Sequence, residues 1–161
     1  MKRFIPVALA LVLISCSKNE TTLGDPTNLY QAINDHFSHS IDLDNLDNYA
    51  NQSIPNFITK DNTKDNPITD KGATLGRILF YDKSLSIDNS IACASCHKQD
   101  YAFGDLDAAS TGVNGSTARH SMRLVNSRFS IEEKFFWDER AATLEEQTTM
   151  PIQDHVEMGY S

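Results

Sequence analysis

The sequence has few cysteines, no surplus of basic side chains, no internal repeat and no long stretch of alternating β-strand pattern. Its formal net charge of −8 leaves no basic surface for a phosphate backbone, so nucleic acid is not expected as a partner. The missing β pattern favours a mainly α-helical fold. A length of 161 residues is enough for one domain with a modest core.

Apolar runs are also scarce, and the one clear run lies at the N-terminus. Lys2 and Arg3 precede about ten apolar residues, a pattern typical of a secretory signal peptide and too short for a membrane-spanning helix. The run ends at Cys16 in the order Leu-Ile-Ser-Cys, which resembles the bacterial lipoprotein box. We therefore expect residues 1–15 to be a lipoprotein signal peptide and residues 16–28 to be a flexible tether. An ordinary signal peptide followed by an unrelated cysteine is the alternative.

The lipoprotein box predicts where the protein resides. An acylated Cys16 would hold the chain on a membrane, because each buried methylene contributes about 0.8 kcal/mol. Ser17, rather than an acidic residue, follows the cysteine, which in lipoproteins indicates the outer membrane. We expect a periplasmic protein that is lipid-anchored to the bacterial cell envelope, at the outer membrane rather than the inner one.

The other two cysteines form a motif with a histidine. Cys93 and Cys96 are three positions apart and His97 follows directly, which is the C-x-x-C-H attachment pattern for c-type haem. Two thiols on one helical turn can form thioethers to the haem vinyl groups, and the histidine can ligate the iron. A redox-active C-x-x-C pair would need an apolar strand before Cys93, which is missing. A zinc site would need four ligands, and the remaining histidines show no paired spacing.

Local signals predict two helices around this motif. Thr69 can cap a helix that ends near Tyr81, with apolar residues at helical spacing. Thr143 and Glu146 form a capping box for a second helix, which we expect to stop by Pro151. Residues 98–121 read as a long loop that wraps the haem edge, residues 122–129 as a helix, and residues 29–59 as one or two short helices.

The residues that flank the motif resemble a known family. Residues 75–86, which read LGRILFYDKSLS, resemble the L-G-x-x-L-F-x-D-x-x-L-S segment of the bacterial di-haem cytochrome c peroxidases and their MauG-like relatives. The similarity continues in order through residues 102–105, 136–140, 144–147 and 151–159. The resemblance implies that residues 29–161 form the N-terminal, peroxidatic haem domain, a cytochrome c-like helical domain with long loops.

The resemblance also implies roles for individual side chains. Cys93 and Cys96 would attach one haem c, and His97 would be the proximal ligand of its iron. Glu157 and Gln147 match the distal-pocket glutamate and glutamine of the family. Two further residues complete the implied site, namely Trp137 between two haems and Arg119 as a partner for a haem propionate.

These roles imply a cytochrome-c peroxidase that reduces hydrogen peroxide to water. Its electrons would come from a small c-type cytochrome or a copper protein. Glu157 would take a proton from peroxide and return it, as general base and then general acid. Gln147 would position peroxide without adding charge. A homodimer is left open.

The chain departs from the family pattern at several positions. Val113 stands where many members have a histidine on the distal iron position, so we expect an open distal site, with His120 as the one nearby substitute. His120 also replaces the asparagine of the R-N-S-P segment, and it is a poor calcium ligand, so a family calcium ion is doubtful here. Glu139 replaces the glycine of F-W-D-G-R.

A second C-x-x-C-H motif is missing, and with it the second haem domain of the family. We expect the chain to be part of a longer protein rather than a complete single-haem protein. Two alternative functions remain at this point. One is a membrane-tethered single-haem cytochrome that transfers electrons without peroxidase activity, and the other is a MauG-like oxidation of a protein partner.

Overall fold

The computed structural model describes residues 31–38, 40–132 and 134–160. The expected signal peptide, the lipidated Cys16 and the tether over residues 16–28 lie outside these described residues. Among the residues that are described, no helix is both long and apolar enough to cross a lipid bilayer.

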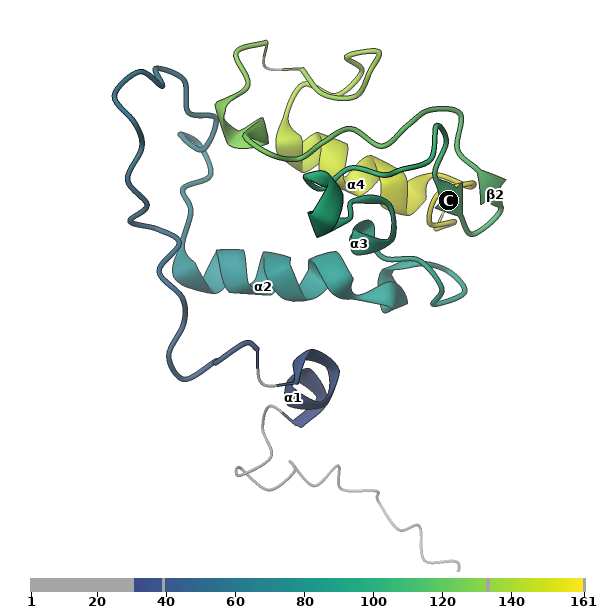
Figure 1. Ribbon diagram of the computed structural model, residues 1–161, viewed down its shortest axis with the longest axis horizontal. Coiled ribbons are helices and arrows are strands. Elements are labelled where there is room, and N and C mark those ends of the chain that lie inside the picture. Colours follow the sequence, from purple (N-terminus) through teal and green to yellow (C-terminus); the bar gives the residue numbers. More distant parts are fainter. Residues whose placement is uncertain (1–30, 39, 133, 161) are drawn as a thin grey trace, which may run out of the picture.

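Within the described residues, the regular structure includes four α-helices and one short hairpin. Figure 1 shows their arrangement. The mainly α prediction is confirmed, and long loops connect the elements. The α-helices are α1 (Gln31–Phe37), α2 (Asp70–Tyr81), α3 (Cys93–Cys96) and α4 (Leu144–Gln153). The hairpin pairs β1 (Thr111–Gly112) with β2 (Gly115–Ser116), and single 3-10 turns occur at η2 (Lys83–Leu85), η3 (Gln99–Tyr101) and η4 (Ser127–Phe129).

Helix α2 begins where its sequence predicts. The Thr69 hydroxyl accepts the N–H of Gly72 at 3.0 Å, which satisfies one of the free donors of the first turn. The helix ends at Tyr81, and the carboxylate of the following Asp82 accepts the N–H of Ser84 at 2.8 Å and so caps the start of η2. Helix α3 lies directly above α2 in Figure 1, and the two helices are in contact. The predicted cap therefore fixes the platform for the C-x-x-C-H motif.

Helix α4 has the predicted N-cap at Thr143 but only one half of the predicted capping box, and it ends later than expected. The Thr143 hydroxyl accepts the Glu146 N–H at 3.1 Å, whereas the Glu146 carboxylate bonds the N–H of Ala142 rather than that of Thr143. The expected stop at Pro151 is wrong, because the helix continues to Gln153. Proline removes only one backbone donor near the end of this helix, and a turn anchored at Asp154 receives the chain immediately afterwards.

The loops contain structure that the sequence did not predict. Residues 98–121 include η3 and the β1–β2 hairpin instead of being wholly irregular. The expected helix over residues 122–129 is reduced to η4, because Asn126 has a left-handed φ of 62° that a continuous helix cannot include. The expected short helices in residues 29–59 are represented by α1.

Acidic side chains tie the N-terminal arm, residues 41–68, to the rest of the fold. The carboxylate of Asp70, at the start of α2, accepts the N–H groups of Tyr49 and Ala50 at 2.7 and 2.8 Å. Asp61 forms a two-point ion pair with Arg128, with contacts of 2.9 and 2.6 Å. Bidentate pairs of this kind restrict geometry as well as adding energy. The arm therefore follows a defined path from α1 to α2, which can be followed in Figure 1, and it contacts Arg128 on the way.

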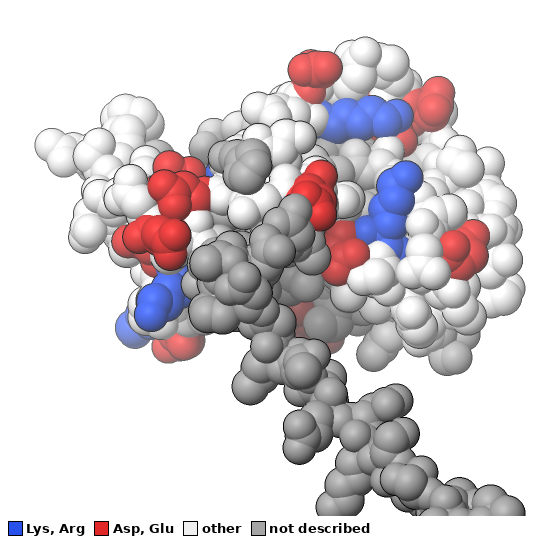
Figure 2. Space-filling view, turned by 90° about the horizontal axis from the view of Figure 1, so that it is seen from below, with Lys and Arg blue, Asp and Glu red and all other residues white. Residues whose placement is uncertain are grey.

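The apolar core is small. In the described part of the chain, the buried hydrophobic residues are Ile41, Ala92, Ala141 and Met158. Large apolar side chains remain exposed, among them Phe57 at 83% and Leu75 at 55%. Figure 2 shows acidic and basic side chains interspersed on one face, without a broad area of a single sign. Helix caps, backbone hydrogen bonds and ion pairs therefore hold much of the structure around α3 in place.

Glu139 occupies a backbone position that suits glycine. Its φ is 56°, in the left-handed region, and its N–H bonds the Phe136 carbonyl at 3.1 Å in the tight loop closed by the Phe135–Ala141 bridge. A side chain in this region costs roughly 1–2 kcal/mol. This explains in physical terms why the F-W-D-G-R pattern has glycine here.

We expect Glu139→Gly to stabilise the protein by about 1 kcal/mol, because it removes the left-handed strain while retaining the turn. The measurement is chemical unfolding of the haem-loaded protein. Glu132→Gly is the matched control, since Glu132 is exposed and has no positive φ, and it should not stabilise. Equal effects of the two substitutions would contradict the strain assignment.

Candidate haem site

Cys93 and Cys96 are the first and last residues of α3 and lie one helical turn apart. Both thiols are free and half-buried. Burial raises the pKa of both, and for Cys96 the charges of Asp105 and Glu157 add to this rise. Half-buried protonated thiols at this spacing fit covalent attachment to a haem. Among the residues that the structure describes, no group of three or more His, Cys, Asp or Glu side chains could hold a metal ion, so the zinc alternative finds no support there.

His97 follows α3 with its imidazole fixed by the backbone. Its Nδ1 lies 2.8 Å from the carbonyl oxygen of Phe103, which can only accept, so Nδ1 carries the proton. Burial lowers the pKa of His97, and backbone bonding to Phe103 and Met122 opposes this shift. The ring is therefore favoured in its neutral form with a lone pair on Nε2. That form is the one required for a histidine that ligates haem iron.

A closed loop holds the Phe103 carbonyl in place. Lys98 and Gly104 form an antiparallel bridge, with the Lys98 N–H 2.8 Å from the Gly104 carbonyl. The Phe103 N–H returns to the Lys98 carbonyl at 2.9 Å. Ala102 and Phe103 both have left-handed φ values of 56°, which turn the chain back toward the motif. The hydrogen-bond acceptor for His97 is thus a product of backbone closure and not of a side chain.

The segment that carries Glu157 lies against the β1–β2 hairpin. The N–H groups of Val113 and Asn114 donate to the carbonyls of Glu157 and Val156 at 3.0 and 3.2 Å. Gly112 makes this approach possible, because a Cβ there would clash with the Val156 carbonyl oxygen. The hairpin therefore brings Glu157 to the haem motif, and its charge acts on Cys96.

Glu157 is half-buried rather than a solvated surface acid. Burial raises the pKa of its carboxyl, the charge of Asp154 raises it further, and Arg140 opposes both. The Asp154 carboxylate also accepts the N–H groups of Val156 and Glu157, at 2.8 and 3.0 Å. One side chain thus fixes the backbone of Glu157 and also makes its proton harder to remove.

Val113 and His120 differ in their relation to the motif. Val113 sits in the hairpin turn, with its side chain near Gly159. His120 Nδ1 lies 2.8 Å from the Asp107 carbonyl, and the charge of His120 lowers the pKa of His97. Val113 has no side-chain atom that can ligate iron, and the open distal site stays a prediction.

The remaining predicted residues lie in two places. Trp137 is 59% exposed, and its Nε1 donates to the His120 carbonyl at 2.8 Å. Arg119 pairs with Asp138 at 2.8 Å, and Arg140 pairs with the same carboxylate at 2.8 Å. These residues form one polar cluster beside the 119–122 segment. Gln147 is half-buried in the middle of α4, and no role for it follows from its contacts.

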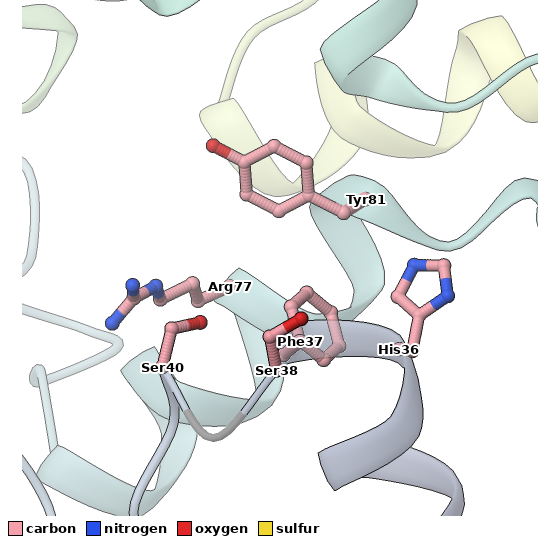
Figure 3. A pocket seen from close by; sticks show the side chains of 6 residues that line it. All are labelled: His36, Phe37, Ser38, Ser40, Arg77 and Tyr81. Atoms are coloured by element: carbon pink, nitrogen blue, oxygen red, sulfur yellow. The ribbon is translucent and has the colours of Figure 1, made fainter.

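A hollow with a volume of about 330 Å³ lies between α1 and α2. Figure 3 shows the side chains that line it. Phe37 and Tyr81 form its apolar side, and Arg77 extends toward it from α2. Its full lining is His36, Phe37, Ser38, Ser40, Arg77 and Tyr81. None of the residues predicted for the haem site belongs to this lining. The hollow is therefore separate from the C-x-x-C-H motif.

Comparison with known proteins identifies similar sequences in one family of haem proteins. Residues 70–161 match the family model described as di-haem cytochrome c peroxidase. MauG of Methylophilus methylotrophus is 40% identical over 100 residues, which cover 59% of this chain and 28% of that protein. Cytochrome c peroxidase Ccp of Escherichia coli K12 is 37% identical over 94 residues, which cover 58% of this chain and 20% of that protein.

A solved structure shares the fold. It is described as a MauG-like protein associated with microbial copper homeostasis, and it superposes with a TM-score of 0.62 at 34% sequence identity. The match covers 69% of this chain and 35% of that chain. This chain spans less than a third of the length of the MauG and Ccp relatives that it matches. The family match covers the C-x-x-C-H motif and Glu157 alike, and the chain belongs to the di-haem cytochrome c peroxidase family.

Proposed function

We propose that this chain is the peroxide-reacting haem domain of a cytochrome-c peroxidase. Cys93 and Cys96 hold one haem c, and His97 is the proximal ligand of its iron. The domain reduces hydrogen peroxide to water with electrons from a reduced c-type cytochrome or a copper protein. Family membership and the half-buried thiols, with a neutral imidazole beside them, support this proposal.

The observation that carries the proposal is the environment of Glu157. A carboxylate with a raised pKa can accept a proton and release it again near neutral pH more readily than a surface acid. Each hydrogen peroxide takes up two electrons and two protons and leaves as two waters. Haem, when bound, supplies the iron centre at which peroxide reacts. Glu157 takes the proton from one peroxide oxygen and delivers it to the other.

Three further side chains have supporting roles in this proposal. Gln147 positions peroxide by hydrogen bonding, and Arg119 pairs with a haem propionate while Asp138 holds its guanidinium. Trp137 carries electrons toward the haem from a second haem domain. Its exposure and its bond to the His120 carbonyl leave the indole face free for that contact. Calcium is not part of the proposal, because His120 replaces the family asparagine.

The cellular setting is proposed from the sequence. Residues 1–15 act as a lipoprotein signal peptide, residues 16–28 as a tether, and lipid on Cys16 anchors the protein at the outer membrane, in the periplasm. Cys16→Ser should move the protein from the membrane fraction to the soluble fraction of the cell envelope. Continued membrane attachment of this variant would contradict the anchor.

A second candidate function is MauG-like oxidation of a protein partner. The 40% identity to MauG and the exposed Trp137 favour it, since an exposed indole can exchange electrons with a docked protein. Peroxide consumption by the full-length protein separates the two. Turnover that depends on a reduced cytochrome or copper protein supports the peroxidase, whereas oxidation of a protein substrate without such a donor supports the MauG-like activity.

We expect Glu157→Gln in the full-length protein to lower kcat for peroxide by roughly 10²- to 10⁴-fold, because glutamine cannot transfer the proton. Haem content, measured as the pyridine haemochrome, should not change. Glu132→Gln, at an exposed acid, is the control and should keep full turnover. Normal peroxide turnover by the Glu157 variant would sink the catalytic assignment.

The pH dependence of kcat/KM offers a second test of Glu157, because two variants should shift it in opposite directions. Asp154→Asn retains the oxygen that accepts the Val156 and Glu157 N–H groups but removes a charge that raises the pKa of Glu157, so the acid limb of kcat/KM should move to lower pH. Arg140→Gln removes a charge that lowers the same pKa, so the limb should move to higher pH. Arg140→Lys keeps the charge and should leave the limb near its original position. Shifts of the same sign in the Asn and Gln variants would exclude Glu157 as the titrating group.

A further inference from the structure

Asp105 is one of the few buried charged residues, and the peroxidase proposal gives it no role. Its side chain is 3% exposed. One carboxylate oxygen lies 2.8 Å from Lys98 Nζ and 2.7 Å from the N–H of Leu106. Burial opposes ionisation, but the hydrogen bond from Lys98 and those of its other partners outweigh it and lower the pKa of this carboxyl to about 2. Asp105 is therefore a buried anion with a complete set of partners.

The partners of Asp105 belong to the segment that follows His97 and closes beside it. Lys98 starts the loop whose closure places the Phe103 carbonyl on His97 Nδ1. Ser110, whose side chain helps to lower the pKa of Asp105, is buried, and its hydroxyl lies 2.6 Å from that of Ser121. Ser121 directly precedes Met122, whose backbone raises the pKa of His97. Asp105 is therefore connected, through Lys98, to the loop whose Phe103 carbonyl holds the imidazole.

The same network extends toward the hairpin. Ser110 precedes β1, and its N–H and carbonyl bond Thr117 just after β2, at 3.0 and 2.8 Å. These bonds close the hairpin at its base, while Val113 in the turn binds the Glu157 segment. Loss of the Asp105 carboxylate is therefore expected to disturb the loop that holds His97 more than it disturbs the rest of the fold.

We propose that Asp105, together with Lys98, is a positioning residue that fixes the His97–Phe103 hydrogen bond and thereby sets the strength of the proximal ligand of the haem. A hydrogen bond from Nδ1 to a fixed acceptor makes the imidazole more basic and favours ferric iron. Loosening the Lys98–Asp105 closure weakens this bond, so the imidazole becomes a poorer ligand and the reduction potential rises. This inference depends on haem attachment but not on peroxide chemistry.

The test uses Asp105→Asn and Lys98→Gln in the full-length, haem-loaded protein. The readouts are the iron–histidine stretching frequency of the ferrous domain, by resonance Raman, and its midpoint potential. A positioning role predicts that both variants lower the frequency and both raise the potential. Loss of charge alone would move the potential in opposite directions, since one variant removes an anion and the other a cation. Lys134→Gln breaks an exposed ion pair with Glu139 and is the control that should change neither readout.

The outcomes separate this inference from the proposed function. Shifts of the midpoint potential in the same direction in both variants support the positioning role of Asp105, even if the protein shows no peroxidase activity. Opposite shifts in potential, or an unchanged stretching frequency with haem attached, overturn it. Lys98 is 41% exposed, so its variant tests the inference even where the Asp105 variant does not accumulate. The double variant Lys98→Gln/Asp105→Asn restores local neutrality and should still show the lower frequency.

Discussion

The hydrogen bond between His97 Nδ1 and the Phe103 carbonyl is the constraint around which the haem motif is arranged. A carbonyl can serve this purpose only if its own chain is held still, and residues 98–105 achieve this by closing on themselves. The bridge between Lys98 and Gly104 and the left-handed turn at residues 102 and 103 leave the loop little freedom. The backbone of residues 98–105, which directly follow the motif, therefore sets the orientation of the His97 imidazole.

The rest of the domain depends on polar contacts because apolar burial is limited. Few hydrophobic side chains are buried in the part that the structure describes, and capped helix ends, ion pairs and buried hydroxyls hold the loops together. Such contacts have small net energies individually, typically about 1 kcal/mol for a hydrogen bond. A covalently attached porphyrin adds a large apolar surface to such a chain. Haem attachment and stability are therefore expected to be closely linked in this domain.

The sequence predicts best those features whose residues lie close together along the chain. The cap at Thr69, the N-cap at Thr143 and the spacing of Cys93, Cys96 and His97 are read within a few residues, and each was predicted. The approach of the β1–β2 hairpin to the Glu157 segment depends on partners that are distant along the chain. The extension of α4 past Pro151 and the burial of Asp105 depend on local side-chain hydrogen bonds that no residue pattern specifies. The A-F-G-D segment after the motif was the one available signal for Asp105, and it did not show that the carboxylate is buried.

The close contact at Gly112 has a consequence for the spacing of the pocket. The backbone of β1 and the carbonyl of Val156 approach so closely that no side chain fits between them, and the neighbouring hydrogen bonds at Val113 and Asn114 leave no slack. The hairpin therefore fixes the distance between the haem motif and Glu157. A methyl group at residue 112 would push the two backbones apart and so change this distance, without altering Glu157 or the motif itself.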